Sequence, residues 1–286
     1  MLSFRLLEPS DLPDLHAVYN IAFAAHAVTT PLDAEQFEQK MQNDGVDLAY
    51  SVGAFDQRRL VAFIMHAPGF WNQHFTVYNA ATGVHPDYRG QRLTRRMYEF
   101  LQPALQITDV RQCLLEVARE NEPAWESYQQ VGFRISRSFH CYQTALPATW
   151  DVADLDVYVQ PAPILAAELR TQAAWLDRQP SWQNSLDAIL RSPRDKLHFQ
   201  AWREDTCVGY LIAQKATGHI LQFGVHPDHR RRGVARALFA RIARTAYAPR
   251  LTVLNIDRDR TGIHNFLVDL GFAPLYAQHE LLLTLD

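Results

Sequence analysis

The sequence predicts an α+β fold in two domains, each of which combines antiparallel hairpins with one strand–helix–strand crossover. The first observation behind this prediction is a repeat: VHPDYRG at 84–90 returns as VHPDHRR at 225–231, 141 residues later. The second is a Gly-Phe pair at 132–133 that returns at 271–272, 139 residues later. Two separate landmarks with nearly the same offset indicate a duplicated domain in this chain of 286 residues.

The first half contains an element pattern that follows from short apolar runs and helical spacing. Strands are expected where apolar runs are bounded by turn residues, at 2–7, 48–55, 60–66, 75–84, 111–117 and 133–144. Helices are expected at 11–25, 33–42, 91–106 and 121–131. In the third of these helices, Leu93, Met97, Phe100 and Leu101 recur at helical spacing. Residues 67–74 are expected to form a loop.

The second half repeats this order after a predicted linker at 146–154. Its strands are expected at 155–160, 197–203, 207–213, 219–225, 251–256 and 272–284. Its helices are expected at 163–177, 184–191, 231–246 and 260–270. The predicted domains are therefore 1–146 and 154–286.

The bulk composition is that of a globular protein without a basic excess. Hydrophobic residues make up 48% and charged residues 21% of the chain, and the formal net charge is −3. This charge gives no case for a nucleic-acid partner, and no apolar run approaches the roughly 18 residues of a membrane span. The N-terminal residues contain acids and prolines where a signal peptide is apolar. We therefore expect a cytoplasmic protein.

Cysteines and histidines give no metal site. The three cysteines are widely spaced and odd in number, which indicates neither a disulfide framework nor a zinc site. His226 and His229 could bring two ligands together, but no third ligand lies nearby at a familiar spacing. We expect no bound metal.

The crossover after each VHPD segment is the part of the chain that carries chemistry. A buried strand ends there, and a basic run with small residues begins a helix. Unpaired N–H groups and the positive end of the helix dipole suit a pyrophosphate. In the second half, Gly233 and Ala235 let a ligand approach the backbone, and the arginines before them attract phosphate.

This segment resembles the acyl-CoA-binding motif of the GNAT N-acetyltransferase superfamily, Arg/Gln-x-x-Gly-x-Gly/Ala. Arg230, Gly233 and Ala235 match all three specified positions. In the first half Arg89 matches, whereas Arg92 and Thr94 replace the small residues. These two side chains are tolerable if the positions are helical with negative φ.

The resemblance implies that acetyl-CoA is the cofactor and that each domain is a mixed, mostly antiparallel twisted sheet flanked by helices. It places the expected cofactor contacts at Arg89, Gly90, Gln91, Arg92, Leu93 and Thr94 in the first half, and at Val225, Arg230, Arg231, Arg232, Gly233, Val234 and Ala235 in the second.

A second landmark follows the next strand. Residues 121–133 are similar to the family's Asn-x-x-Ala-x-x-x-Tyr-x-x-x-Gly-Phe pattern at every named position. The resemblance implies that Asn121 lies beside the pantetheine arm and that Tyr128 protonates the departing thiolate. Seven residues span about two helical turns, so both side chains share one face. The second half has Arg260 and Leu267 at these positions, and leucine has no proton to give. We therefore expect chemistry in the first domain.

The implied reaction is direct acyl transfer, in which a neutral amine attacks the thioester of acetyl-CoA. The resemblance makes the N–H groups of Thr82, Gly83 and Val84 the candidates that polarise the carbonyl. No Asp or Glu lies between Thr76 and Val84. The candidates for a general base acting through water are therefore Glu116, His74 and His66, and an amine that arrives deprotonated needs little help.

Two alternatives remain open at this point. One is catalysis in the second domain with an unidentified acid, and the other is a non-catalytic acyl-CoA-binding or regulatory protein. A nucleotide-dependent enzyme is a poorer reading, because neither half contains Gly-x-x-x-x-Gly-Lys-Ser/Thr or Gly-x-Gly-x-x-Gly at its turn. The expected acceptor is the amine of a small molecule or peptide, and the chain is expected to be a monomer or homodimer.

Overall fold

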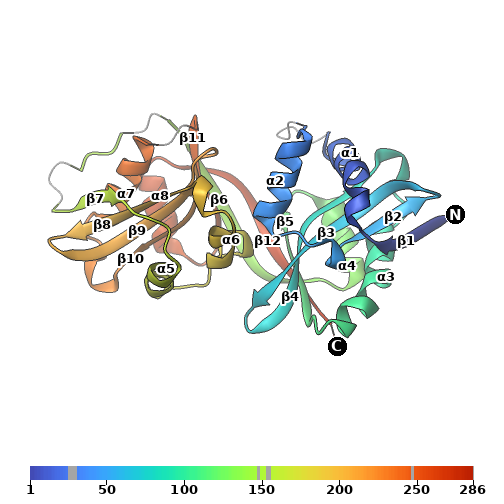
Figure 1. Ribbon diagram of the computed structural model, residues 1–286. Coiled ribbons are helices and arrows are strands. Elements are labelled where there is room, and N and C mark those ends of the chain that lie inside the picture. Colours follow the sequence, from blue (N-terminus) through green and yellow to red (C-terminus); the bar gives the residue numbers. More distant parts are fainter. Residues whose placement is uncertain (25–30, 147–148, 153–155, 246–247, 286) are drawn as a thin grey trace. The chain divides into compact units, whose positions relative to one another are not determined.

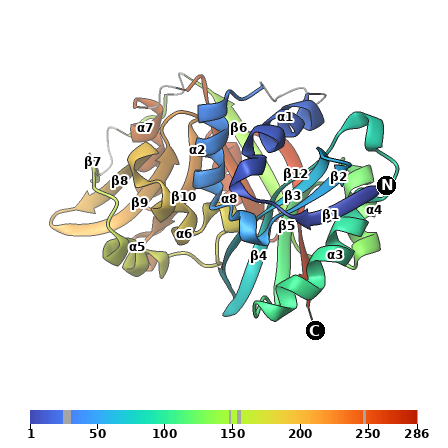
Figure 2. The same ribbon diagram turned by 45° about the vertical axis from the view of Figure 1, so that its right-hand side comes forward.

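The computed structural model describes residues 1–24, 31–146, 149–152, 156–245 and 248–285 (Figures 1 and 2). It divides into two compact units. Unit 1 comprises Met1–Arg137 and His279–Asp286, and unit 2 comprises Ser138–Gln278. Among the described residues, no helix is both long and apolar enough to cross a membrane.

Two strands belong to both units. β6 (Arg134–Ala145) begins in unit 1 and continues in unit 2, whereas β12 (Ala273–Thr284) begins in unit 2 and ends in unit 1. The units therefore differ from the sequence-based domains 1–146 and 154–286, because an apolar pattern identifies a strand but not its partner. The predicted linker, 146–154, and the start of the second predicted domain fall partly outside the described residues.

Unit 1 is a mixed sheet that contains both antiparallel and parallel neighbours. Its strand order is β1-β2-β3-β4-β5, followed by the end of β12 and the start of β6. β4 and β5 pair in parallel over Thr76–Tyr78, and the pairs from β1 to β4 are antiparallel. The bounds are β1 (Leu2–Leu6), β2 (Val52–Asp56), β3 (Arg59–Trp71), β4 (His74–Val84) and β5 (Gln112–Ala118).

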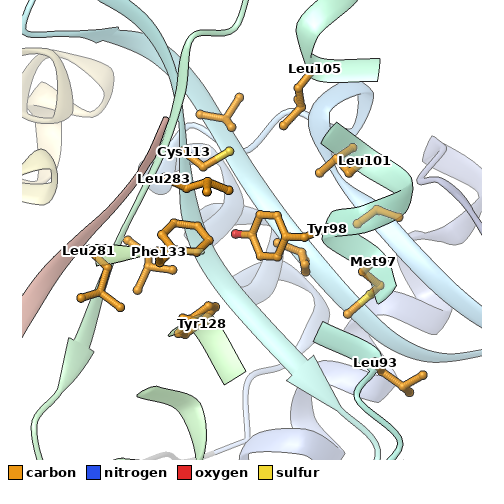
Figure 3. Close-up of a cluster of buried hydrophobic side chains, with 14 of the residues drawn as sticks. Leu93, Met97, Tyr98, Leu101, Leu105, Cys113, Tyr128, Phe133, Leu281 and Leu283 are labelled. Atoms are coloured by element: carbon orange, nitrogen blue, oxygen red, sulfur yellow. The ribbon is translucent and has the colours of Figure 1, made fainter. Parts of the chain in front are cut away.

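Helices cover both faces of the unit 1 sheet. α1 (Leu12–Phe23) and α2 (Ala34–Asp44) share a buried cluster with Phe63 of β3, and α3 (Leu93–Ile107) and α4 (Glu122–Val131) share another with Ile64. These neighbours on β3 point to opposite faces, as the strand repeat requires. Figure 3 shows the second cluster, to which α3 contributes Leu93, Met97, Tyr98, Leu101 and Leu105.

Unit 2 repeats this arrangement. Its strand order is β7-β8-β9-β10-β11, followed by the later part of β6 and the start of β12. The bounds are β7 (Tyr158–Pro161), β8 (Lys196–Arg203), β9 (Thr206–Gln214), β10 (His219–Val225), β11 (Arg250–Asp257), α5 (Ala166–Ala173), α6 (Leu186–Arg191), α7 (Val234–Ala243) and α8 (Thr261–Asp269). β10 and β11 pair in parallel, with the register His219↔Thr252 and Ile220↔Val253.

Several predicted elements differ from the structure. The strand predicted at 48–55 begins as a short 3-10 helix (Leu48–Tyr50), and the helix predicted at 163–177 is shorter. The predicted loop 67–74 is instead a hairpin formed by β3 and β4. Its turn is the pair Asn72 and Gln73, with φ of 49° and 68°, the left-handed pair of a two-residue hairpin. Phe100 is 42% exposed, unlike the other three periodic residues of α3.

Candidate active site

The C-terminal end of β4, beyond its pairing with β5, presents backbone N–H groups on the side away from β3. This side is called the open edge of β4. Parallel pairing with β5 covers only Thr76–Tyr78. The N–H of His85 donates to Val61 O at 2.9 Å, which identifies the positions that face β3. Because a strand alternates, the N–H of Gly83 also faces β3, whereas those of Thr82 and Val84 face away from it. Of the three predicted carbonyl-polarising residues, the structure turns these two toward the open edge and Gly83 away.

Tyr128 lies on α4 with its hydroxyl close to β4. Its side chain is 8% exposed, and Asn79 Nδ2 lies 3.5 Å from the phenol oxygen. Burial raises the pKa of Tyr128, whereas hydrogen bonds from Thr82 and Asn79 act to lower it. The net pKa lies above the ordinary value of a phenol, so Tyr128 is protonated at neutral pH, as a proton donor must be.

Local sequence explains where α4 begins and ends. Asn121 is its N-cap, and Asn121 Oδ1 accepts a hydrogen bond from Ala124 N at 3.3 Å. Gly132 ends the helix in the left-handed conformation, with φ of 113°. Asn121 thus has a capping role besides the cofactor contact that the sequence predicts, and Tyr128 follows it by about two turns.

The three candidates for the general base differ sharply in their surroundings. His66 is fully buried, and burial lowers its pKa to about 4, so it does not take up a proton at neutral pH. His74 is exposed in the hairpin, at the opposite end of β4 from Val84. Glu116 is half-buried in β5, between Leu115 and Val117, which point into the same core as Tyr128. Its side chain therefore projects from the opposite face of β5.

The helix start in unit 1 departs from the expected backbone. Arg92 is the N-cap of α3 and has φ of 55°, so it is left-handed and not helical. Gly90, two residues earlier, has φ of 75°. The side chain of Arg89 contacts α1 and not the helix start, since its guanidinium donates a hydrogen bond to Ala22 O at 3.0 Å. Leu93 is 2% exposed and packs in the core, so only its backbone can meet a ligand.

The helix start in unit 2 borders a cavity of about 920 Å³. The cavity is lined by the predicted residues Val225, Arg230, Arg231, Gly233, Val234 and Ala235, together with the start of α8. Arg232 lies outside this lining. Gly233 is the N-cap of α7 with φ of 80°, the position that Arg92 occupies in unit 1. These residues fit a diphosphate, because the first turn of α7 offers donors in a basic surrounding.

An acidic side chain connects the two arginine-bearing walls of this cavity. Asp177 Oδ1 accepts from Arg230 Nη1 at 2.9 Å, and its other oxygen pairs with Arg260 at the N-cap of α8. These two guanidinium groups hold the pKa of Asp177 below its ordinary value, the Arg260 hydrogen bond most strongly. The sequence did not predict this contact, because Asp177 lies in an irregular segment far along the chain from both arginines.

A smaller cavity of about 90 Å³ lies between β10 and β11. Its lining includes the buried polar side chains of Asn184, Gln222 and Asn255. Leu267, which replaces the tyrosine of unit 1, is fully buried in the core of unit 2. Within the described residues, no group of three or more His, Cys, Asp or Glu side chains is arranged to hold a metal ion.

Sequence reasoning missed Asn79 and Tyr98 near Tyr128, and it named Thr82 only for its backbone N–H. Asn79, Thr82 and Tyr98 are linked by hydrogen bonds of 2.8–3.1 Å, and Asn79 is 7% exposed. The available signal was the one amide in the apolar run FTVYNAATGV, since a buried polar group needs partners.

Comparisons with known proteins agree with this architecture. The model of the acetyltransferase (GNAT) family matches residues 13–133 and 165–272. No curated protein matches the chain. A GCN5-related N-acetyltransferase from Sphaerobacter thermophilus is 16% identical, with a TM-score of 0.72 over 100% of this chain and 96% of that one.

Two other solved structures are similar over the whole chain. A tandem GNAT protein from the clavulanic acid biosynthesis pathway is 12% identical, with a TM-score of 0.73 over 100% of this chain and 99% of that chain. A putative acetyltransferase from Pyrococcus horikoshii is 15% identical, with a TM-score of 0.66 over 100% and 90%. These likenesses concern the fold. The two matched segments show that the chain belongs to the acetyltransferase (GNAT) family, as a tandem member with one copy of the domain in each half.

Proposed function

We propose that the chain transfers the acetyl group of acetyl-CoA to the primary amine of a small molecule or peptide, and that unit 1 carries the chemistry. The observation that carries this proposal is the phenol of Tyr128 beside the open edge of β4. Unit 2 has Leu267 at the corresponding position, which cannot donate a proton.

The steps follow from the groups at this edge. The amine nitrogen attacks the carbonyl carbon of the thioester, and the N–H groups of Thr82 and Val84 stabilise the developing negative charge on oxygen. The new C–N bond forms and the C–S bond breaks. Tyr128 gives its proton to the leaving sulfur and regains one from solvent. The proton lost by the amine goes to water, with Glu116 as the candidate acceptor through that water.

The experiment is a transfer assay with the purified chain. Acetyl-CoA is mixed with a panel of amino sugars, aliphatic amines and peptide N-termini, and thiol release is measured together with the mass of the acetylated product. Gain of one acetyl group by an amine, with equal release of thiol, supports the proposal. Binding of acetyl-CoA without transfer to any panel member contradicts it and favours a non-catalytic acyl-CoA-binding protein.

A second candidate role concerns unit 2. The cavity of about 920 Å³ beside Gly233 favours binding of CoA there without chemistry. Calorimetric titration with CoA measures the number of sites in the wild-type chain and in Ala235→Glu, which places a negative charge in the first turn of α7 where the diphosphate would bind. Loss of one site in the variant supports a CoA site in unit 2, and an unchanged isotherm contradicts it.

A further inference from the structure

We propose that His66, Tyr98 and Asn79 are positioning residues, which form a one-directional hydrogen-bond chain that fixes Tyr128 as a proton donor beside the open edge of β4. This inference rests on the proposed function, because it assigns a purpose to the surroundings of the proposed acid. The direction of each hydrogen bond follows from the chemistry of the partner before it.

The hydrogen-bond chain starts at a backbone carbonyl. His66 Nδ1 lies 2.9 Å from Tyr50 O, and a carbonyl only accepts, so Nδ1 carries the proton. Burial lowers the pKa of His66 to about 4, so the ring is neutral at physiological pH. The other ring nitrogen, Nε2, is therefore an acceptor.

This tautomer sets the direction of the next two bonds. Tyr98 Oη lies 3.3 Å from His66 Nε2, so the Tyr98 hydroxyl must donate to the ring. With its only proton committed, Tyr98 Oη can only accept from Asn79, whose amide lies 3.0 Å away. The amide of Asn79 must then present its nitrogen, and not its oxygen, to Tyr98.

The fixed amide presents donors to the phenol of Tyr128. One hydrogen of Asn79 Nδ2 goes to Tyr98, and the other faces Thr82 Oγ1 at 2.8 Å and Tyr128 Oη at 3.5 Å. Thr82 Oγ1 also lies 3.1 Å from Asn79 Oδ1, which it can reach as a donor. Since the phenol oxygen faces a donor on this side, the hydrogen of Tyr128 is directed away from Asn79 and stays available for transfer.

Packing holds both phenols in place. The ring of Phe133 lies 5.2 Å from that of Tyr98 and 5.6 Å from that of Tyr128, both edge-on. Figure 3 shows Tyr98 projecting from α3 toward Phe133, with Tyr128 nearby on α4. Tyr98 is fully buried, so its hydroxyl has no water to replace a lost partner.

The hydrogen-bond chain acts when Tyr128 transfers its proton. When the C–S bond breaks, the O–H proton of Tyr128 moves to the sulfur and leaves a phenolate. The N–H of Asn79 then donates to that phenolate oxygen, and the Thr82 hydroxyl turns from Asn79 Oδ1 to donate to it as well, which stabilises the transition state more than the ground state. His66 and Tyr98 contribute by preventing the amide of Asn79 from rotating.

Two variants test the direction of the chain. Asn79→Asp replaces the N–H donor by a carboxylate acceptor of the same shape, and Tyr98→Phe removes the bond that orients the amide while it keeps the ring. With acetyl-CoA and the best amine of the panel, we expect kcat to fall about tenfold in Asn79→Asp and a few-fold in Tyr98→Phe. The KM for acetyl-CoA should stay near the wild-type value.

The pH profile separates this role from a structural one. Rate is lost at alkaline pH when Tyr128 ionises, and removal of a donor raises the pKa of Tyr128, so the alkaline limb should move to higher pH in Asn79→Asp. Thr76→Val is the matched control, because Thr76 lies on β4 like Asn79 and its hydroxyl accepts a buried hydrogen bond from Gln112 of β5. It should lower thermal stability and leave the alkaline limb in place. A wild-type kcat and pH profile in both test variants would overturn the proposal.

The Tyr128→Phe background separates this proposal from the proposed function. If Tyr128→Phe itself leaves kcat unchanged, the assignment of the acid fails and the positioning chain fails with it. If Tyr128→Phe lowers kcat, adding Asn79→Asp should cost little more, since the two act through one group. A full additional tenfold loss in the double variant would overturn the positioning role alone.

A measurement without substrate tests the start of the chain. The ¹⁵N chemical shifts of His66, assigned by comparison with His66→Gln, should show a protonated Nδ1 and a bare, hydrogen-bonded Nε2. In Tyr98→Phe the Nε2 signal should move toward that of an unbonded ring nitrogen. A protonated Nε2 in the wild-type chain would contradict the proposed direction.

Discussion

Arg92 and Gly233 occupy the same backbone position at the starts of α3 and α7. Both are N-caps in the left-handed region, with φ of 55° and 80°. A side chain in this conformation costs about 1–2 kcal/mol, so unit 1 keeps an unfavourable residue where the motif has glycine. The condition under which the sequence made a side chain tolerable there, a helical residue with negative φ, is not met at Arg92, because the motif turns before the helix begins.

A matched pair of alanine substitutions tests this reading. Gly233→Ala should lower the free energy of unfolding of unit 2 by about 1 kcal/mol, because alanine is strained at positive φ. Gly262→Ala adds a methyl group in α8 with no atom within 4 Å and should raise stability by up to about 1 kcal/mol. Denaturant titration measures both. Equal effects of the two substitutions would contradict the left-handed role of Gly233.

His66 predicts a dependence of stability on pH. Burial depresses its folded pKa from 6.5 to about 4, so between these values the unfolded chain binds a proton that the folded chain does not. Stability is therefore complete above about pH 6.5 and falls toward pH 4, by at most about 1.4 kcal/mol per pH unit. His66→Gln should flatten the pH dependence of unfolding in unit 1. The same slope in both proteins would show that His66 does not titrate as described.

At the scale of elements, the end of the C-terminal strand, from His279 onward, is part of the first unit. Leu281, Leu283 and Leu285 are buried in the same cluster as Tyr128, and the N–H of Leu285 donates to Arg111 O at 2.8 Å. Arg137 of β6 forms an ion pair with the buried carboxylate of Glu280 at 2.5 Å. The last residues of the chain thus complete the core that holds the proposed acid.

Truncation tests the contribution of β12. A chain that ends at Gln278 should lose the fold of unit 1, because it lacks the buried residues Leu281, Leu283 and Leu285. Replacement of a single buried leucine by alanine already lowers the free energy of unfolding by about 2–5 kcal/mol. Fragment 1–146 should be unfolded alone for the same reason. Limited proteolysis and near-UV circular dichroism measure both. A folded, protease-resistant fragment 1–146 would contradict this division of the chain.

The contact of Asp177 with the helix starts predicts an effect on CoA affinity. The carboxylate pairs with Arg230 and Arg260 in the cavity beside α7 and so competes with a bound diphosphate. Asp177→Asn should tighten the binding of CoA to unit 2 several-fold, measured by calorimetry at low salt. Weaker binding in the variant would mean that Asp177 orients the arginines and does not compete with the ligand.

At the scale of the whole molecule, the two units divide the features of one site. Unit 1 has Tyr128 beside the open edge of β4, and its helix start carries Arg92. Unit 2 has Gly233 and a large cavity at its helix start, and Leu267 where the acid would stand. Duplication allows this division, because each copy can lose a part that the other copy keeps.

The sequence predicts much of this fold and less of the site. The repeat near 84 and 225 predicts two α+β units, and β10 has the bounds expected from HILQFGV. The sharing of β6 and β12 between the two units could not be predicted, because alternation of apolar residues indicates burial but not which strand lies beside them. The chain from His66 to Asn79 depends on contacts across three elements, which local patterns do not encode.

The most direct test of the central claim is kcat at saturating acetyl-CoA in Tyr128→Phe, measured beside CoA affinity by calorimetry. The phenol is the proposed proton donor in unit 1, and phenylalanine keeps its ring against Phe133. We predict that kcat falls about 10²-fold or more, while the affinity for CoA stays within about twofold of the wild type. Wild-type turnover in this variant would contradict the account and move the chemistry away from Tyr128.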